Sequence, residues 1–362
     1  MLPEPPSANS QPLVIDAESP ALTLPRVLQS HRLKLFYGDL HNHTGDSDGV
    51  GRPEDALRQM RQRGLHFAAI TDHGEFFDRG SETHNAGRWA SLAEQTAALG
   101  GDDFVAIRGF EWSSPQQGHS NVWWSSDYTG YLRTGDQRMN AYYEWLRAAR
   151  QTDGTERVLA GFNHPGREPA SFDNYNYSPA TDNLVVTLEC FNRDDEYGEA
   201  YFRALDHGWH LGAIGVSDHH GDDWGNSRWP RAGLLAPALT VSAIQQALLA
   251  RHVFATRSPT LALIVAGNTE LMGGRLSLVR REALTIGVWC DDPGASRART
   301  RLELWTNGGE LVGATETRGL QQVRWRTQLA PRGAAKERWF VIRVLHGDMT
   351  LSYSSPVWAR WQ

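Results

Sequence analysis

Side chains of the types that bind metal ions follow five separate apolar runs of this sequence. These side chains are His41, His43, Asp48, His73, Glu111, His119, His164, Asp218 and His220. In parallel α/β folds the loops that follow the strands converge at one edge, and functional sites are built there. If the apolar runs are parallel strands, five distant segments therefore contribute to one cluster.

The nine side chains offer nitrogen and oxygen atoms but no sulfur. Six histidines, two aspartates and one glutamate suit Zn²⁺, Mn²⁺ or Fe²⁺ in a hydrolytic site that holds more than one ion. Carboxylates are needed because neutral ligands alone cannot offset several dications, and Glu111 is the natural bridge between two of them. Two histidines spaced like His41 and His43 also occur on ordinary strands that bind no metal. The prediction of a metal site therefore depends on the whole set of nine residues.

The elements that position these residues alternate between strand and helix from about residue 33 to residue 259. Apolar runs such as LKLFYGDLHNH and LHFAAITDHG are separated by helix-like stretches such as PEDALRQMRQRG. Pro53 suits the first turn of a helix and Gly64 suits its end. Further helices are expected at about 140–150, 196–209 and 241–251. This alternation of strands and helices predicts a parallel sheet or barrel.

The alternation of strand and helix candidates stops after about residue 260. Short strand candidates follow one another with turn signals between them and no amphipathic helix, which predicts a small antiparallel β-sandwich over residues 260–362. Residues 1–32 are rich in Pro and Ser and predict an extended arm. We therefore divide the chain into an arm (1–32), an α/β part (33–259) and a sandwich (260–362).

The segments GDLHNHTGDSDG, GLHFAAITDH, FEWS, NHPG and GVSDHH resemble, in this order, the motifs of the PHP (polymerase and histidinol phosphatase) superfamily. The match spans about residues 37–220. With its strand-rich tail, the whole chain resembles the branch that includes the bacterial carbaryl hydrolases. The resemblance implies an α/β fold, a distorted (β/α)7 barrel followed by a small antiparallel β-sandwich, and a centre of two or three divalent ions.

Carried over residue by residue, the resemblance implies three ligand groups. They are His41, His43, Glu111 and Asp218 for a first ion, Glu111, His119 and His164 for a second, and Asp48, His73 and His220 for a third. All nine positions hold suitable residue types, so the ligand set is complete.

The expected mechanism follows from charge. Two ions that share Glu111 can bridge a water, lower its pKa towards neutrality and present hydroxide to carbon or phosphorus. The same ions stabilise negative charge in the transition state. The candidates for the acid that protonates the leaving group are His220, Asp218 and His73.

Two arginines directly follow predicted strand-end ligands. Arg167 lies in HPGRE and Arg193 in CFNRDD, and both would anchor an anionic substrate. Ion pairs with the neighbouring Glu168, or with Asp194 and Asp195, explain them at least as well.

The reaction class has two interpretations. The superfamily resemblance implies phosphoester hydrolysis, which we favour, whereas the resemblance of the whole chain implies hydrolysis of carbamate, ester or amide bonds. Aromatic residues close after the ligand motifs would line an apolar pocket for an aryl group or simply pack. They are Phe76, Phe77, Trp112, Trp123, Trp124 and Trp224. A third hypothesis, which we rank lowest, makes the β-sandwich a binding module and the barrel a scaffold stabilised by metal.

Polar residues beside the nine candidates have weaker signals. Asp39, Asn163 and Asn192 are candidates for orienting ligands through hydrogen bonds, although capping of strand ends explains them equally well. Glu189 ends a strand at the same edge, and functional and structural roles are equally compatible with it. Asp72 and His219 flank stronger candidates, and we expect them to orient ligands or to face solvent.

The composition of the chain indicates which classes of partner to expect. The chain has 362 residues and a formal net charge of −6, so nucleic acid is not expected as a partner, and a small-molecule substrate is. No stretch reaches the roughly 18 apolar residues of a membrane span, and the N-terminus lacks the pattern of a secretory signal. We therefore expect a cytoplasmic location and no membrane contact. Cys190 and Cys290 have no metal-type or redox-type spacing and are expected to be buried. Oligomeric state is left open.

Overall fold

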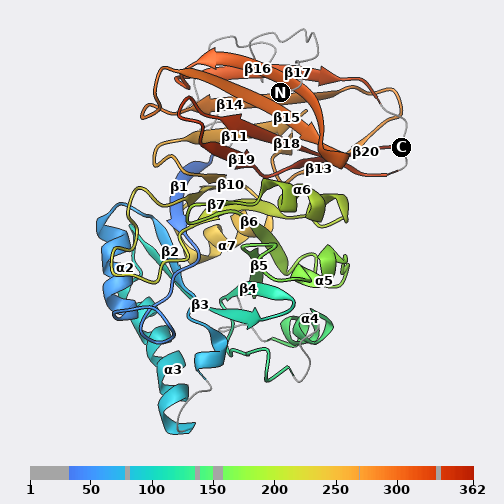
Figure 1. The fold of residues 1–362 in the computed structure, drawn as a ribbon. Coiled ribbons are helices and arrows are strands. Elements are labelled where there is room, and N and C mark those ends of the chain that lie inside the picture. The colour runs from blue at the N-terminus through green and yellow to red at the C-terminus, as the bar shows by residue number, and fades with distance from the viewer. Residues whose placement is uncertain (1–31, 78–81, 135–138, 150–157, 269, 332–335) are drawn as a thin grey trace.

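The computed structural model describes residues 32–77, 82–134, 139–149, 158–268, 270–331 and 336–362. The expected N-terminal arm lies outside these residues except for Arg32. The described chain forms two stacked parts, a mixed α/β part below and a strand-rich part above it (Figure 1). Among the described residues, no helix is both long and apolar enough to cross a bilayer.

Parallel strands form most of the α/β part. β1 (Lys34–Asp39), β2 (Phe67–Ile70) and β3 (Val105–Ser114) are parallel neighbours, as are β5 (Leu159–Asn163), β6 (Val185–Asn192) and β8 (Gly212–Val216). Between these two groups, β4 (Gly118–Trp123) runs antiparallel to both β3 and β5. The short β7 (Asp195–Glu196) pairs with β6.

Helices cover the outside of these strands (Figure 1). They are α2 (Pro53–Gln62), α3 (Glu82–Leu99), α4 (Met139–Ala148), α5 (Ser171–Tyr175), α6 (Gly198–Asp206) and α7 (Val241–Leu249), with a short 3₁₀ turn, η1 (Gly74–Phe76). Helix α2 begins at Pro53 as predicted, and Gly64, with φ 85°, follows its end. A left-handed φ favours glycine there because it has no Cβ.

The two ends of the strand series meet through irregular contacts. β1 pairs antiparallel with β9 (Arg231–Ala236), which pairs with β10 (Val253–Thr256). Asn42 and His219 form an isolated parallel bridge just beyond β1 and β8, and the amide of His43 donates to the carbonyl of His219 at 2.9 Å. These contacts bring the first and last ligand segments together.

The C-terminal part is built almost entirely of strands. They are β11 (Ala262–Gly267), β12 (Glu270–Leu271), β13 (Arg275–Leu278), β14 (Leu284–Asp291), β15 (Arg299–Thr306), β16 (Glu310–Arg318), β17 (Val323–Leu329), β18 (Arg338–Leu345), β19 (Leu351–Ser354) and β20 (Val357–Trp361), with a 3₁₀ turn η2 (Asn307–Gly309). One four-stranded sheet has the order β12-β11-β14-β17. The other strands continue the sheet of the α/β part, because β19 pairs with β10.

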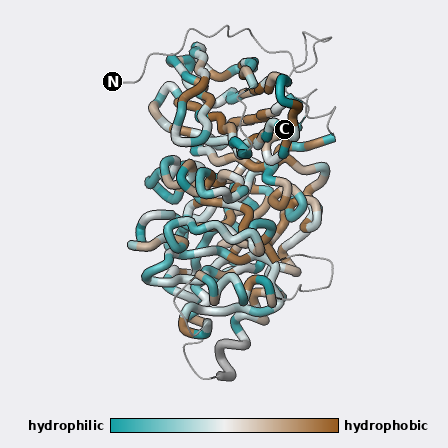
Figure 2. Tube along the Cα trace, turned by 90° about the vertical axis from the view of Figure 1, so that its right-hand side faces the viewer, coloured by the Kyte–Doolittle hydropathy of each residue, from teal (hydrophilic) through white to brown (hydrophobic). Residues whose placement is uncertain are grey.

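Apolar side chains form buried clusters in both parts, and hydrophobic segments of the chain run through the middle of each part (Figure 2). One buried cluster joins the two C-terminal sheets to Leu235 and Phe254 of the α/β part, so the two parts share a core. Cys190 and Cys290 are buried and unpaired, as expected.

The predicted fold class is confirmed as a mixed α/β part with parallel strands followed by a small antiparallel sheet. The sequence did not reveal β4, β9 or β10. The proposed boundary at residues 259 and 260 stays a prediction, since β10 and β19 pair across it.

Candidate metal centre

The structure brings all nine predicted ligand residues to one edge of the α/β part. His41 and His43 follow β1, His73 follows β2, and His164 follows β5. His119 lies near the start of β4, where it pairs with Ser113 near the end of β3. Because β4 is antiparallel, its beginning lies at the same edge as the ends of the parallel strands.

Glu111 lies at the centre of the cluster. Its side chain is 1% exposed, and five histidine rings approach its carboxylate. The nitrogen–oxygen distances are 3.2 Å for His41, 3.5 Å for His43, 2.8 Å for His73, 3.2 Å for His119 and 3.4 Å for His164. Both of its oxygens lie close to histidine nitrogens, so the carboxylate is placed where it could contact two ions.

Asp218 completes one ligand group with two of these histidines. Its Oδ1 lies 3.4 Å from Nε2 of His41 and 3.2 Å from Nε2 of His43. The two imidazole nitrogens are 3.0 Å apart. One ligand atom from each of the three buried side chains lies within 4.8 Å of the others.

Asp48 anchors a second, more open group. Its carboxylate lies 3.5 Å from Nε2 of His73 and 3.3 Å from Nε2 of His220, and His43 also belongs to this group. Asp48 is 41% exposed and His220 29%. This end of the cluster therefore faces solvent, whereas the end at Asp218 is buried.

Glu189 contacts the ring nitrogen of His41 that points away from Glu111. Its Oε1 lies 2.7 Å from Nδ1 of His41, and its Oε2 accepts hydrogen bonds at 2.8 Å from the amide of His164 and from the side chain of Asn192. Histidine ligands usually give their second ring nitrogen to such a partner. The structure thus favours an orienting role for Glu189 and gives Asn192 a supporting contact.

The other polar neighbours also support the cluster indirectly. Asn163 donates to Glu111 Oε1 at 2.7 Å. Asp39 accepts from the amides of His41 at 3.3 Å and Ser217 at 3.2 Å. Asp72 accepts at 2.7 Å from both the amide and the hydroxyl of Thr44, so it fixes the loop that leads to Asp48.

His219 faces away from the cluster. Its Nε2 lies 2.7 Å from Asp223, and its ring lies near those of Trp224 and Trp229. Only its backbone serves the site, through the bridge to Asn42.

Two ligand positions have unusual backbone conformations. The φ angles of His164 and Asp218 are 26° and 45°, in or near the left-handed region that L-residues rarely adopt. Each such residue costs on the order of 1–3 kcal/mol and persists where the surroundings enforce it. The hydrogen bonds of the His164 amide and of the Asp218 carbonyl to Glu189 and Arg193 hold the two positions.

The electrostatics of the cluster suit a cation. Although burial opposes it, the charges of His119 and His41 hold the pKa of Glu111 well below its usual range. The pKa of Asp218 is also lowered, by His41 and His43 against the effect of burial. Burial, aided by the charge of His73, lowers the pKa of His43 to about 3. Against the effect of burial, the carboxylates in turn raise the pKa of His41, His73 and His119. The carboxylates and His43 are therefore in the protonation states that bind metals, whereas an ion would displace a proton from each of the other three rings.

The arrangement of the donor atoms in the structure fits divalent ions. Nitrogen and oxygen atoms converge in groups of three or four, and Nδ1 of His164 is buried without a hydrogen-bond partner among the described residues. Buried polar atoms normally have partners. A cation bound by these atoms would satisfy more of them than their mutual hydrogen bonds can.

Both predicted arginines reach the cluster at Asp218. Arg167 Nη1 lies 3.4 Å from Asp218 Oδ2, and Arg193 Nε donates to the Asp218 carbonyl at 2.8 Å. Arg167 also pairs with Asp195 at 3.0 Å, so part of the alternative ion-pair interpretation holds as well. The two side chains are 35% and 40% exposed and form one rim of the site.

Sequence reasoning missed Glu168 as part of the site. The sequence indicates Glu168 only as an ion-pair partner of Arg167, yet its carboxylate forms a group with His119 and His164. Its Oε1 lies 3.9 Å from Nε2 of His119. The only available signal was its position four residues after a ligand in HPGRE, which does not reveal where the side chain points.

The proposed aromatic pocket is not formed by most of its members. Phe77, Trp112, Trp123, Trp124 and Trp224 are at most 5% exposed and belong to hydrophobic clusters, or in the case of Trp224 also donate to the carbonyl of His43. Large rings close to a ligand motif in sequence turn into the core because burial of their apolar surface is favourable. Phe76 differs, since it is half-buried and its ring stacks on His73 at 5.9 Å.

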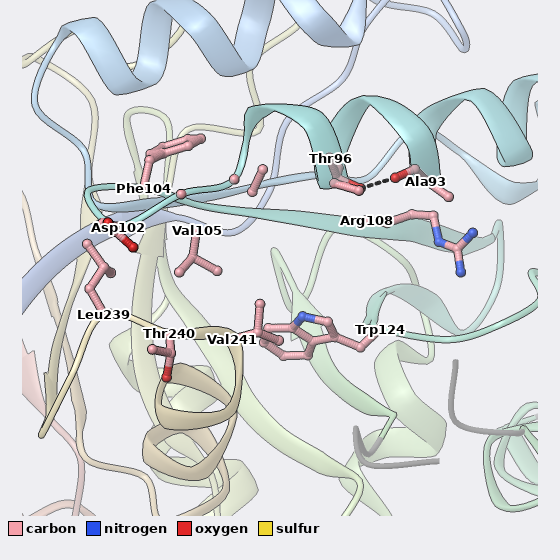
Figure 3. A pocket seen from close by; sticks show the side chains of 14 residues that line it. Ala93, Thr96, Asp102, Phe104, Val105, Arg108, Trp124, Leu239, Thr240 and Val241 are labelled. Carbon is pink, nitrogen blue, oxygen red and sulfur yellow. Dashed lines mark hydrogen bonds between the residues drawn. The ribbon is translucent and has the colours of Figure 1, made fainter. Parts of the chain in front are cut away.

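A separate cavity of about 450 Å³ lies outside β3, between α3 and the start of α7 (Figure 3). Its lining includes Phe104, Trp124 and Val241 but none of the nine candidate ligands. The hydroxyl of Thr96 donates to the carbonyl of Ala93, and Arg108 donates to the carbonyl of Ser125. These two polar side chains of the cavity thus bond to the protein itself, and we assign no chemistry to the cavity.

Comparison with known proteins shows similarity in structure alone. No family model and no curated protein matches the chain. A two-domain protein from Bacteroides vulgatus that contains a predicted PHP-like metal-dependent phosphoesterase matches 90% of this chain and 96% of its own, with a TM-score of 0.51 and 17% identity. The two chains share one fold.

Two further solved structures match about half of the chain. One is a proposed metal-dependent phosphoesterase from Bifidobacterium adolescentis, with 16% identity, a TM-score of 0.32, and coverage of 51% of this chain and 88% of that one. The other is an amidohydrolase from Chromobacterium violaceum with bound sulfate and no metal, with 14% identity, a TM-score of 0.30, and coverage of 52% and 90%.

Proposed function

We propose that this protein is a metal-dependent phosphoesterase. The observation that carries the proposal is the pair of half-exposed guanidinium groups, Arg167 and Arg193, beside Asp218 at the rim of a nine-residue nitrogen and oxygen cluster. Guanidinium groups bind phosphate oxygens bidentately. A site with several dications and two arginines suits a substrate that carries negative charge.

The bound ions would supply an activated water and would neutralise charge on the substrate oxygens. The chain supplies positions for them. His41, His43 and Asp218 hold the buried end, Glu111 links it to His119 and His164, and Asp48, His73 and His220 form the open end. The numbers and identities of the ions, two or three of Zn, Mn or Fe, remain part of the proposal.

The protein's own groups also define candidates for proton transfer. His220 is the most exposed of His220, His73 and Asp218, and its Nδ1 lies 2.9 Å from the carbonyl of Asp218. Its Nε2 faces Asp48 and the solvent side of the cluster. We therefore place His220 first among the candidate acids for the case in which no ion occupies the Asp48 end, because a nitrogen bound to an ion cannot donate a proton.

A second candidate function is hydrolysis of carbamate, ester or amide bonds at the same centre. The observation that favours it is Phe76, which is half-buried beside His73 and would contact an aryl group. A single ring is a weaker anchor than the two arginines, which is why phosphoester chemistry stands first.

The test is a hydrolysis assay of the wild type after loading with Mn²⁺ or Zn²⁺. The panel contains an aryl phosphate monoester, an aryl phosphodiester, an aryl ester and naphthyl N-methylcarbamate. The Asp218→Asn variant removes a ligand charge while keeping the side-chain size, and Arg167→Met with Arg193→Met removes the rim charges. Metal content of each variant is measured by mass spectrometry.

Turnover of a phosphate ester that Asp218→Asn abolishes, and that Arg167→Met weakens through a raised KM, supports the phosphoesterase. Turnover of the ester or carbamate alone, unaffected by the arginine variants, replaces it with the second candidate. If the wild type binds metal but hydrolyses none of the four compounds, the result contradicts both candidate functions. It would then favour the hypothesis that the β-sandwich is a binding module.

A further inference from the structure

Glu168 lies over the His119 side of the cluster although no part of the predicted ligand pattern includes it. Its side chain is 13% exposed, and its Oε1 is 3.9 Å from Nε2 of His119. Nδ1 of the same ring lies 3.2 Å from Glu111. The imidazole of His119 therefore sits between two carboxylates, one in the centre of the cluster and one outside it.

The loop that carries Glu168 is fixed against the β3–β4 hairpin. The amides of Ala170 and Phe172 donate to the carbonyls of Gln116 and Gln117 at 3.1 and 2.6 Å. The hydroxyl of Ser171 donates to the carbonyl of Glu168 at 3.0 Å. The backbone of Glu168 is thus held in place beside the strand that carries His119.

The Glu168 carboxylate has unused hydrogen-bonding capacity. Its Oε2 is buried and has no partner among the described residues, and it packs so closely on β4 that a Cβ at Gly118 would lie 3.3 Å from it. Burying an ionised carboxylate oxygen without a donor or a cation is costly. The side chain therefore gains from any donor that comes within reach, and Nε2 of His119 is the ring nitrogen that faces it.

The same arrangement is already complete at another histidine of the cluster. His41 directs Nε2 to Glu111 at 3.2 Å and Nδ1 to Glu189 at 2.7 Å. A carboxylate on the second nitrogen fixes the tautomer and the ring orientation of a metal-binding histidine. His119 has the mirror arrangement, with Nδ1 towards Glu111 and Nε2 towards Glu168.

We infer that Glu168 is the positioning residue of His119. With an ion bound, it would accept the one proton left on the His119 ring at Nε2, and the Nδ1 lone pair would be free for the ion on the Glu111 side of the cluster. The 3.9 Å between Oε1 of Glu168 and Nε2 of His119 exceeds a hydrogen bond, so the side chain would have to rotate to form one, and no hydrogen bond from the described residues holds its Oε2 against that rotation. The inference rests on the proposed metal centre and deepens it by adding a residue to the His119–His164 subsite.

The experiment is a titration of the full-length, metal-free protein with Co²⁺, whose visible absorption reports the ligand environment. We compare the wild type, Glu168→Gln, Glu168→Ala, His119→Ala and the double variant His119→Ala with Glu168→Ala. Glu199→Gln is the matched control, because Glu199 is an exposed glutamate on α6. Thermal melting of each metal-free variant checks that it is folded.

One equivalent of Co²⁺ is expected to bind about 10–100-fold more weakly in Glu168→Ala, with an altered absorption band, while the other equivalents keep wild-type affinity. Glu168→Gln is expected to lose less, because its amide oxygen can still accept the proton of Nε2. In the His119→Ala background, Glu168→Ala should cause no further loss.

Three outcomes overturn the inference. They are unchanged affinity in Glu168→Ala, equal weakening of every equivalent, and a further loss in the His119→Ala background, which would make Glu168 a direct ligand. Failure of the wild type to bind Co²⁺ tightly would instead contradict the proposed metal centre, so the two failures are distinguishable.

Discussion

His210 forms a charged bridge between the two parts of the protein, and its removal should destabilise the fold in a pH-dependent way. Its Nδ1 lies 2.7 Å from Asp182 in the α/β part, and its Nε2 lies 2.6 Å from Glu337 near β18. Both ring nitrogens face carboxylates, so both must carry a proton, and the ring is an imidazolium. Its side chain is 9% exposed.

The surroundings of His210 fix the sign of the pH dependence. Burial lowers the pKa of His210, but the hydrogen bonds with Asp182 and Glu337 raise it more, so the net shift is upward despite the nearby charge of Arg275. Arg251 donates to the backbone carbonyls of His210, Asp182 and Leu249. A raised folded-state pKa gives stability that is fully present below the unfolded value, about 6.5, and is lost as the pH rises through the folded value.

The size of the loss in the free energy of unfolding follows from the two charge-assisted hydrogen bonds of His210. Such bonds contribute roughly 1.5–3 kcal/mol each when buried. The side chain of Glu337 is 27% exposed, which places its bond at the lower end of that range. We therefore expect His210→Gln to lower the free energy of unfolding by about 3 kcal/mol near pH 6, because Asp182 is then left without its charged donor.

The assay is urea unfolding followed by tryptophan fluorescence, at several values between about pH 6 and pH 9. The signal comes from 14 tryptophans, one of which, Trp358, has its ring centroid 5.0 Å from that of His210. His207→Gln is the matched control, because His207 is an exposed histidine three residues away. The difference between wild type and His210→Gln should shrink as the pH rises, whereas His207→Gln should track the wild type throughout.

A difference that stays constant over this range would show that His210 contributes by packing and not by charge. A difference that grows with pH would show that the ring is neutral in the folded protein. Either result refutes the reasoning from the two carboxylates.

Two other variants test the site and the core. Glu189→Gln should weaken binding of the ion held by His41 about 10–100-fold, which Co²⁺ titration measures; unchanged affinity would show that Glu189 is purely structural. Trp209→Ala removes a fully buried ring that contacts Phe162 and Tyr143 and should lower the free energy of unfolding by about 3–5 kcal/mol. A loss below 1 kcal/mol in urea unfolding would show that the neighbouring rings collapse into the space.

The parallel elements of the α/β part were predictable because their signals are local. Helix α2 begins at Pro53 and is followed by Gly64 as expected, and the runs that became β1, β2, β5, β6 and β8 are continuous and apolar. By contrast, β4 was missed because GHSNVW contains few apolar residues. It is a strand because the tight turn before Gly118, with φ 91°, folds it back onto β3.

The pairing of β10 with β19 shows a second limit of local reasoning. The two strands are about a hundred residues apart, and their register places Phe254 opposite Ser354. Nothing in either short segment specifies its partner. The change of rhythm near residue 260 indicated a new kind of structure, but the continuity of the sheet depends on contacts between distant segments.

The sequence by itself determined the chemistry of the candidate site. To predict a cluster from the types of the nine candidate ligand residues and their positions after apolar runs, it was enough that parallel strands end at a common edge. The tertiary structure decided which neighbours serve them. Glu189 and Glu168 are both glutamates near ligand motifs, yet only packing turns their carboxylates towards His41 and His119. Side-chain direction depends on the whole fold, since backbone angles and distant contacts set it together.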